Sequence, residues 1–280
     1  MGAWVHDLTL GSTHWTLATP PLPAPLRPYV RSWMGYSERS PGPTRRRELP
    51  GAAVVLIIEL GPPLRLSASG QEVCQRRRQQ SFVAGLDTAF TFTEHDGAQE
   101  GVQVNLTPLG ARVLLGPGIK ELSGYTASLS ELAPELGDLA DRLAAADWPT
   151  RFRVVVGLLT ARIQKQAWTP SAADRAIAEI EARGGQVRVE QLATDLGLSR
   201  RRLGQLFEAQ VGLPPKLYAE LVRFERLTQA IKADLGPWSE LAATLGFADQ
   251  AHLSREVRRF SGLTPTGLRG LIGGFPSEVA

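Results

Sequence analysis

Two stretches in the last third of the chain decide the fold. The first is QLATDLGLSRRRLGQLFEAQVGLPPKLY (residues 191–218), and the second is ELAATLGFADQAHLSREVRRFSGLTPTGLR (residues 240–269). Both contain a Leu-Ala pair, a Leu-Gly turn, a polar residue and then a second apolar stripe. The copies are offset by 49 residues before the turn and by 50 after it, so the second turn is one residue longer. Similarity at a fixed spacing indicates a repeated structural unit.

Each copy has the pattern of a helix-turn-helix unit, in which a tight turn joins two helices. The turn glycines, Gly197 and Gly246, allow the positive φ that such a turn needs. Ser199 and Asp249 follow where a polar side chain caps the second helix. Apolar residues then fasten that helix to a core: Leu203, Leu206 and Phe207 in the first copy, and Leu253, Val257 and Phe260 in the second.

This arrangement leaves polar residues on the outer face of each second helix. Arginine and glutamine have the donor geometry to read guanine and adenine edges in the major groove. Early positions on the second helix are where such units meet bases. A run of arginines can also be an ordinary solvated helix face, but its place directly after the turn favours DNA contact. The exposed positions are Arg200, Arg201, Gly204 and Gln205, then Gln250, Ala251, His252 and Arg255.

The segment between the copies, PPKLYAELVRFERLTQAIK (residues 214–232), reads as one continuous helix. Its apolar stripe places Tyr218 and Phe224 in a core rather than in a base-stacking role. About 19 residues at 1.5 Å each span roughly 28 Å. Successive major-groove faces lie about 34 Å apart. A rod of this length can place two reading helices in adjacent major grooves.

The two quoted stretches resemble the DNA-binding domain of the AraC/XylS family of bacterial transcription regulators. The second stretch follows the family signature, with Gly-Phe, an arginine, a glycine and Thr-Pro in order. Leu253 and Val257 stand where the family has phenylalanine, and Gly204 and Ala251 are too small to read a base by hydrogen bonding. The resemblance implies base contacts at Arg201, Gly204, Gln205, Gln250, Ala251, His252 and Arg255. We expect phosphate contacts at Ser199, Arg200, Arg202, Arg258 and Arg259.

In the first half of the chain, the apolar residues are spaced differently. Short alternating runs at 52–60, 64–68, 81–85, 89–94 and 101–106 predict the strands of a sandwich or small barrel. Apolar steps of three and four then predict an antiparallel pair of helices at about 130–146 and 149–166. We expect a linker at 167–171, with Thr169 capping the next helix. The predicted fold class is α+β: a β-rich N-terminal domain with a helical extension (1–166), and an all-α C-terminal domain (172–273) of two helix-turn-helix units joined by a long helix.

A second resemblance covers the first half loosely. ELPGAAVVLIIELG (residues 48–61), SFVAGL (81–86) and VNLTPLGARVLLG (104–116) resemble the cupin-like sensor half of a subgroup of these regulators. The resemblance implies a β-rich sensor at 1–115 and a helical dimerisation region at 116–166. A ligand inside a barrel would meet inward residues, although each of them is equally explained as core. The candidates are Trp33, Tyr36, Glu59, Phe82, Phe90, Phe92, Gln103 and Asn105.

Composition excludes several classes of protein. Of the 280 residues, 43% are hydrophobic and 21% charged, which rules out a wholly disordered chain. The net charge of +3 is too small to indicate nucleic acid by itself, so the placement of the arginines must do so. No run approaches the ~20 apolar residues of a membrane span, and no secretory signal begins the chain. We therefore expect a cytoplasmic protein without a membrane partner.

The residues that catalysis or metal binding would need are sparse. The single cysteine, Cys74, excludes an internal disulfide and a four-cysteine zinc site. His6, His14 and His95 are scattered, so we expect no metal and no cofactor. No Ser-His-Asp set or phosphate loop stands out, so we predict no catalytic residues and no enzyme. The expected partners are double-stranded DNA, a small-molecule effector, a second copy in a homodimer and RNA polymerase. The alternative is a first half that only dimerises or grips a protein partner.

Overall fold

The computed structural model describes residues 4–68, 77–165 and 170–273. The chain divides into two units. Unit 1 comprises Met1–Glu48, Ala53–Gly85 and Thr91–Trp168, and unit 2 comprises Thr169–Ala280 with the short segments Leu49–Ala52 and Leu86–Phe90.

The start of the first helix of unit 2 corrects one prediction. The side chain of Ser171 caps this helix by accepting a hydrogen bond from the Asp174 amide at 3.2 Å. The Asp174 carboxylate in turn accepts from the Ser171 amide at 2.8 Å, which completes a capping box. Thr169 and the first residues of the predicted linker lie outside the described residues, but the described helix takes its cap from Ser171.

Unit 1 is built on two antiparallel sheets, as the alternating residues predict. The larger has the strand order β1-β2-β3-β10-β5-β8-β11, and the smaller has the order β4-β9-β6-β7. The larger sheet contains β1 (Val5–Leu10), β2 (Thr13–Ala18), β3 (Val30–Arg39), β5 (Val54–Glu59), β8 (Phe82–Ala84), β10 (Ala98–Leu106) and β11 (Thr126–Ser128). The smaller contains β4 (Thr44–Glu48), β6 (Leu64–Ala68), β7 (Arg77–Gln79) and β9 (Thr91–His95).

The sequence analysis did not predict the first four strands. β1 and β4 lie at the edges of their sheets and carry many exposed or half-exposed residues. An edge strand of this kind lacks the clear apolar alternation on which the prediction relied. The arginine run Arg45–Arg47 is part of β4.

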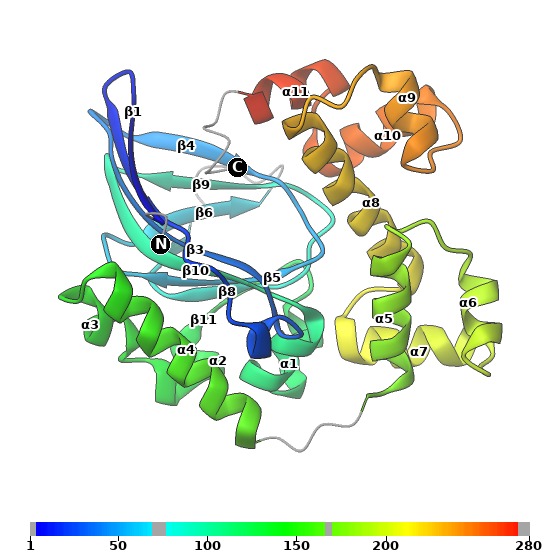
Figure 1. Ribbon diagram of the computed structural model, residues 1–280, viewed down its shortest axis with the longest axis horizontal. Coiled ribbons are helices and arrows are strands. Elements are labelled where there is room, and N and C mark those ends of the chain that lie inside the picture. Colours follow the sequence, from blue (N-terminus) through cyan, green and yellow to red (C-terminus); the bar gives the residue numbers. More distant parts are fainter. Residues whose placement is uncertain (1–3, 69–76, 166–169, 274–280) are drawn as a thin grey trace. The chain divides into compact units, whose positions relative to one another are not determined.

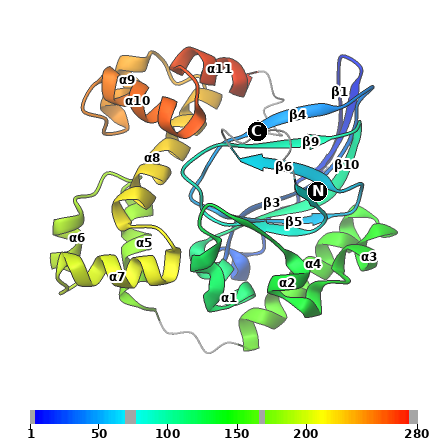
Figure 2. The same ribbon diagram turned by 180° about the vertical axis from the view of Figure 1, so that it is seen from behind.

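One face of the larger sheet packs against helices. Val102 and Val104 of β10 are fully buried there, and the ring of Trp33 on β3 lies 5.1 Å from that of Phe152. Gly35 is required at this face because a Cβ would collide with the indole of Trp148. Figures 1 and 2 show α2, α3 and α4 together on this side of the sheet.

The helices that follow β10 differ in part from the prediction. The second helix of the expected pair is confirmed as α4 (Trp148–Lys165). The first, predicted at about 130–146, is interrupted: α2 (Leu129–Leu132) and α3 (Leu139–Ala144) are separated by a 3-10 turn (Pro134–Leu136). Proline has no N–H for a helical hydrogen bond and clashes with the preceding turn. Within the described residues, unit 1 also contains helix α1 (Pro108–Leu115) and 3-10 turns at Ala24–Leu26 and Pro117–Leu122.

The other face of the larger sheet meets the smaller sheet. Ile57 and Phe82 pack there with Leu64 and Leu66 in a buried cluster. Charge also joins the sheets, because Glu38 of β3 is paired with Arg46 of β4 and, at 3.0 Å, with His95 of β9.

Burial alone would raise the pKa of the Glu38 carboxyl. Hydrogen bonds from His95, Arg46 and Gln99 outweigh burial and hold that pKa below its ordinary value. The carboxylate is therefore ionised and fully paired where the two sheets meet.

Unit 2 is all helix, and the predicted α+β fold is confirmed. Its described helices are α5 (Ala172–Ala182), α6 (Val189–Asp195), α7 (Arg200–Val211), α8 (Pro215–Lys232), α9 (Trp238–Thr244), α10 (Gln250–Ser261) and α11 (Pro265–Gly273). The core includes Tyr218, Phe224, Phe207 and Phe260, and none of these side chains is exposed. Among the helices of the described ranges, none is both long and apolar enough to cross a membrane.

Candidate nucleic-acid interface

Motif 1 consists of α6, a tight turn and α7. Gly197 has the positive φ of +68° that the sequence predicts, and the Leu198 amide donates to the Ala193 carbonyl at 2.9 Å. These bonds end α6 and redirect the chain. Ser199 then caps α7 by accepting from the Arg202 amide at 3.2 Å. The buried face of α7 is formed by Leu203, Phe207 and Val211.

The opposite face of α7 carries the predicted DNA contacts. Arg201, Arg202 and Gln205 are exposed, and Arg201 and Gln205 lie one helical turn apart. Arg200 is also exposed and forms an ion pair of 2.9 Å with Glu190 of α6. Gly204 leaves open space beside this face, since a Cβ there would meet no atom within 4 Å.

Motif 2 repeats the arrangement with α9 and α10. Gly246 has a φ of +76°, and the Phe247 amide donates to the Ala242 carbonyl at 2.9 Å. Asp249 caps α10 by accepting from the His252 amide at 2.6 Å. Leu253, Val257 and Phe260 form the buried face, whereas Gln250, Ala251, Arg255, Arg258 and Arg259 are exposed.

The connecting helix α8 carries the two motifs, as predicted (Figure 1). It has 18 residues, which corresponds to about 27 Å of rigid rod. Helices from both motifs, α7 and α10, pack against it, and so do α5 and α11. The separation of the motifs is therefore fixed by a helix rather than by a loop.

The comparisons with known proteins agree with this geometry. A model of the helix-turn-helix domain matches residues 192–270. This segment is a helix-turn-helix domain of the AraC type. It corresponds to the region that the sequence analysis identified by its resemblance to that family, and the resemblance is confirmed.

A curated relative of the AraC-type domain is the probable transcriptional regulator LumQ of Photobacterium leiognathi. It is 30% identical over 81 residues, which are 29% of this chain and 33% of LumQ. The match thus spans about a third of that relative's length.

Two solved structures are also similar. One is ToxT from Vibrio cholerae O395, with 12% identity, a TM-score of 0.49 and coverage of 83% of this chain and 98% of ToxT. The other is a transcriptional regulator with an AraC-type DNA-binding domain from Chromobacterium violaceum. It has 24% identity, a TM-score of 0.34 and coverage of 36% of this chain and 91% of that chain.

Within the AraC-type domain, His252 differs from the other predicted base contacts. Its Nδ1 accepts from the Ala248 amide at 3.1 Å, and its Nε2 lies 3.1 Å from the Glu256 carboxylate. Arg259 likewise donates to Glu220 of α8 at 2.7 Å. Sequence reasoning missed Glu256, although its spacing of four residues from His252 on one helix face was a signal for the pair.

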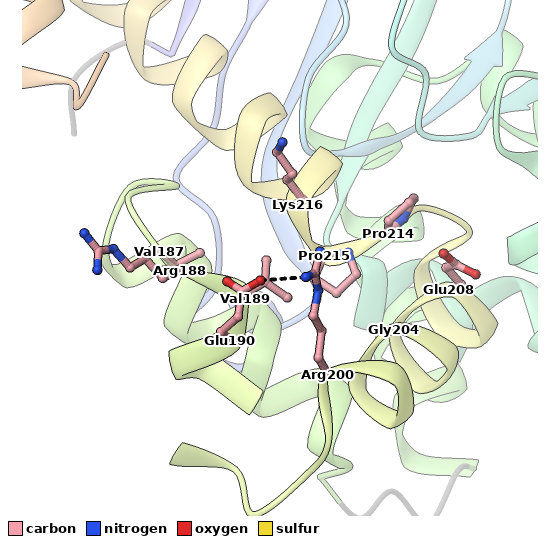
Figure 3. A pocket seen from close by; sticks show the side chains of 10 residues that line it. All are labelled: Val187, Arg188, Val189, Glu190, Arg200, Gly204, Glu208, Pro214, Pro215 and Lys216. Atoms are coloured by element: carbon pink, nitrogen blue, oxygen red, sulfur yellow. Dashed lines mark ion pairs between the residues drawn. The ribbon is translucent and has the colours of Figure 1, made fainter. Parts of the chain in front are cut away.

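A cleft of about 430 Å³ lies beside the reading face of motif 1. Arg200 and Glu190 meet across its centre, while Arg188 and Lys216 extend away from it (Figure 3). Its cations do not converge on one point, so the cleft has no formed anion site. The lining residues are Val187, Arg188, Val189, Glu190, Arg200, Gly204, Glu208, Pro214, Pro215 and Lys216.

In unit 1, two of the predicted effector-pocket residues touch. The Tyr36 hydroxyl donates to Glu59 at 3.3 Å, across Gly101 of the intervening strand. Burial raises the pKa of Glu59 to about 7, although amides of Gly61 and Glu100 and the Tyr36 hydroxyl oppose the rise. Burial, followed by the nearby Glu59 charge, raises the pKa of Tyr36 as well.

The other pocket candidates fall into separate groups. Trp33 faces the helices on the opposite side of the sheet, and Phe82 lies in the core between the sheets. Phe92 lies beneath the guanidinium of Arg45, 3.8 Å from the ring centre, and Phe90 belongs to a segment grouped with unit 2. Gln103 donates to Asn105 at 2.9 Å. Trp33 and Phe92 thus lie away from the Tyr36–Glu59 pair, whereas Phe82, Gln103 and Asn105 share its face of the larger sheet.

Metal ligands are also dispersed. Within the described ranges, no group of three or more His, Cys, Asp or Glu residues could hold a metal ion. His95 is engaged by Glu38 instead, and Cys74 lies outside those ranges.

Proposed function

We propose that the chain is a transcription regulator whose AraC-type domain reads two adjacent major grooves of double-stranded DNA with one protomer. The observation that carries this proposal is the repetition of a capped helix with an exposed polar face at two places along α8. The length of α8, about 27 Å, is close to the spacing of about 34 Å between successive major-groove faces. Packing of both motifs on the same helix keeps that spacing from varying.

The proposal divides the exposed side chains into two classes. Arg201 and Gln205 of α7, together with Gln250 and Arg255 of α10, read base edges, because arginine pairs with guanine and glutamine with adenine. Gly204 and Ala251 contribute shape and apolar contact only. The phosphate class fixes the register on the duplex without specifying sequence, and consists of Ser199, Arg200, Arg202, Arg258 and Arg259.

Control of this activity is assigned to unit 1. A small molecule or a protein partner that binds two arrangements of the chain unequally would shift its DNA affinity. The Tyr36–Glu59 pair is the most enclosed polar contact among the pocket candidates, which supports a ligand with a polar group. The positions of Trp33 and Phe92, away from this pair, favour the alternative, in which unit 1 dimerises or binds a protein and needs no effector.

Selection of bound fragments from a random duplex library, with the full-length protein at two salt concentrations, tests the DNA proposal. We expect two sequence boxes about ten base pairs apart, since that is one helical turn. A symmetric repeat of the pair of boxes would indicate a homodimer. Binding that depends on salt but recovers no motif would contradict sequence-specific reading, because phosphate contacts alone behave in this way.

Two variants separate the classes of contact on the recovered site. Arg201→Ala should relax the preference at one base position of one box, with a loss of about 1–3 kcal/mol. Arg202→Ala should weaken binding to all sequences alike and reduce the salt dependence by about one phosphate contact. If Arg202→Ala instead relaxed one base position, the assignment of the two arginines would be wrong.

A further inference from the structure

A buried charged cluster ties α10 of motif 2 to the connecting helix. Arg223 of α8 directs its guanidinium at Glu256 of α10, with Nη2 on one carboxylate oxygen and Nε 3.3 Å from the other. The Arg223 and Glu256 side chains are only 13% and 8% exposed, so water screens the pair little. His252 adds a third contact, with its Nε2 at 3.1 Å from the same carboxylate.

The hydrogen bonds determine which ring nitrogen of His252 carries the proton. The Ala248 amide can only donate, so Nδ1, 3.1 Å away, must accept with its lone pair. The proton is then on Nε2 and points to the Glu256 carboxylate, which can only accept. The His252 ring also packs edge-to-face with the Phe247 ring, and the two ring centres are 5.6 Å apart. The Arg223 guanidinium lies over the Phe247 ring, 4.9 Å from its centre.

Both polar atoms of the imidazole are therefore used inside the domain. Turning the ring toward a base would leave the Ala248 amide without its acceptor and remove one donor from a nearly buried carboxylate. Such losses cost more than a typical hydrogen bond contributes. The contacts instead join the turn at Ala248, the start of α10 and α8 into one unit.

We infer that His252 is a positioning residue: with Glu256 and Arg223 it fixes how α10 is presented to DNA, and it does not itself read a base. This inference rests on the proposed function. Motif 2 then reads bases through Gln250 and Arg255, whose side chains are exposed on the same helix.

The corresponding positions of motif 1 carry no such cluster. At the offset of 50 residues, Arg202 stands in place of His252 and Leu206 in place of Glu256. Arg202 is exposed, and Leu206 has no group that could accept its charge. The charged cluster is specific to motif 2, so motif 1 of the same chain serves as an internal control.

The inference can be tested by measuring how the full-length protein binds a panel of operators. Each operator has one base pair of the selected site replaced. We expect His252→Ala to weaken binding by about fivefold, the effect of losing one net hydrogen bond, and by the same factor on every operator of the panel. The matched control, Arg255→Ala, should lose preference at one position. A position at which His252→Ala no longer discriminates between bases would overturn the inference.

A double-mutant cycle shows whether His252 acts through Glu256. If it does, His252→Ala should weaken DNA binding less in the Glu256→Gln background than in the unsubstituted protein, because a hydrogen bond to a neutral amide is weaker than one to a carboxylate. Glu256→Gln keeps the volume and an acceptor, so it preserves the fold better than truncation. If the fold-losses in DNA affinity of the two single variants multiply in the double variant, the two side chains act independently, and the inference is overturned.

The ring itself can be observed without DNA. Nitrogen chemical shifts of the His252 side chain in the free full-length protein should show the neutral form with the proton on Nε2. A proton on Nδ1 would contradict the cluster. This measurement separates the two proposals: a protein that selects no DNA motif but shows the Nε2 form fails as a sequence reader while the cluster stands.

Discussion

Motif 1 and motif 2 share a backbone and differ in what their side chains do. Both turns have a glycine at positive φ, and both second helices begin with a side-chain cap. In motif 1 the main ion pair, Arg200–Glu190, is 71% and 65% exposed, whereas in motif 2 the pair Arg223–Glu256 is almost buried. The repeated sequence thus gives both motifs the same backbone shape, while their electrostatics differ.

The difference bears on how each motif holds its reading helix. Motif 1 relies on apolar packing and exposes a run of arginines with open space at Gly204. Motif 2 adds a charged cluster that reaches from the turn to α8 and engages one of its own predicted reading residues. Four sets of variants test this contrast.

The largest difference is expected from the two ion pairs. Glu256→Ala leaves Arg223 as an uncompensated, nearly buried charge and should cost about 3–5 kcal/mol of unfolding free energy. Glu190→Ala removes an exposed pair and should cost less than about 1 kcal/mol. Denaturant titration combined with hydrogen exchange of the α7 and α10 amides measures both. Equal costs would mean that burial does not separate the two pairs.

Truncation of the matched core leucines should affect both motifs alike. Leu203 and Leu253 occupy equivalent positions, and neither is exposed. Each substitution by alanine should cost about 2–5 kcal/mol, from lost burial and the cavity left behind. The same titration checks this expectation. A much smaller cost in motif 2 would indicate that the charged cluster, rather than the core, holds α10.

The two helix caps should differ in how much they stabilise the protein, and the cap with the shorter hydrogen bond should contribute more. Asp249 accepts at 2.6 Å and is charged at a helix N-terminus, while Ser199 accepts at 3.2 Å and is neutral. Asp249→Ala should therefore cost about 2 kcal/mol and Ser199→Ala about 1 kcal/mol. Thermal unfolding of the two variants under identical buffer conditions provides the comparison, and added salt should narrow the gap.

The smallest effect concerns the glycine on the reading face of motif 1. Gly204→Ala should raise the unfolding free energy by about 0.5–1 kcal/mol, because the helix is regular there and the added Cβ meets no atom. Gly197→Ala, its control in the turn, should instead lower it by about 1–2 kcal/mol, since φ is +68°. A loss of stability in Gly204→Ala would show that the open space is filled in solution.

Much of this architecture follows from patterns that are local in sequence. The turn glycines, the caps, the buried stripe of α7 and the continuous α8 were predicted because each depends on neighbours within a few residues. The edge strands β1 and β4 were missed, since their exposed faces show no apolar alternation, and the partner of β4 also lies in a distant segment. The predicted continuous helix at 130–146 is wrong at Pro134. The apolar spacing favoured one helix, but the proline there interrupts helical hydrogen bonding.

The two capped helix-turn-helix motifs on one helix could be predicted from local sequence alone, because helix periodicity, glycine and caps act over a single turn. Local sequence also determined which residues of α7 and α10 lie on the outer face. Which of those side chains are engaged inside the domain depends instead on long-range packing. Arg223 lies 29 residues before His252 in the chain. Its approach to Glu256 depends on how α8 packs against α10, and that long-range contact brings Arg223, Glu256 and the partly exposed His252 into one cluster.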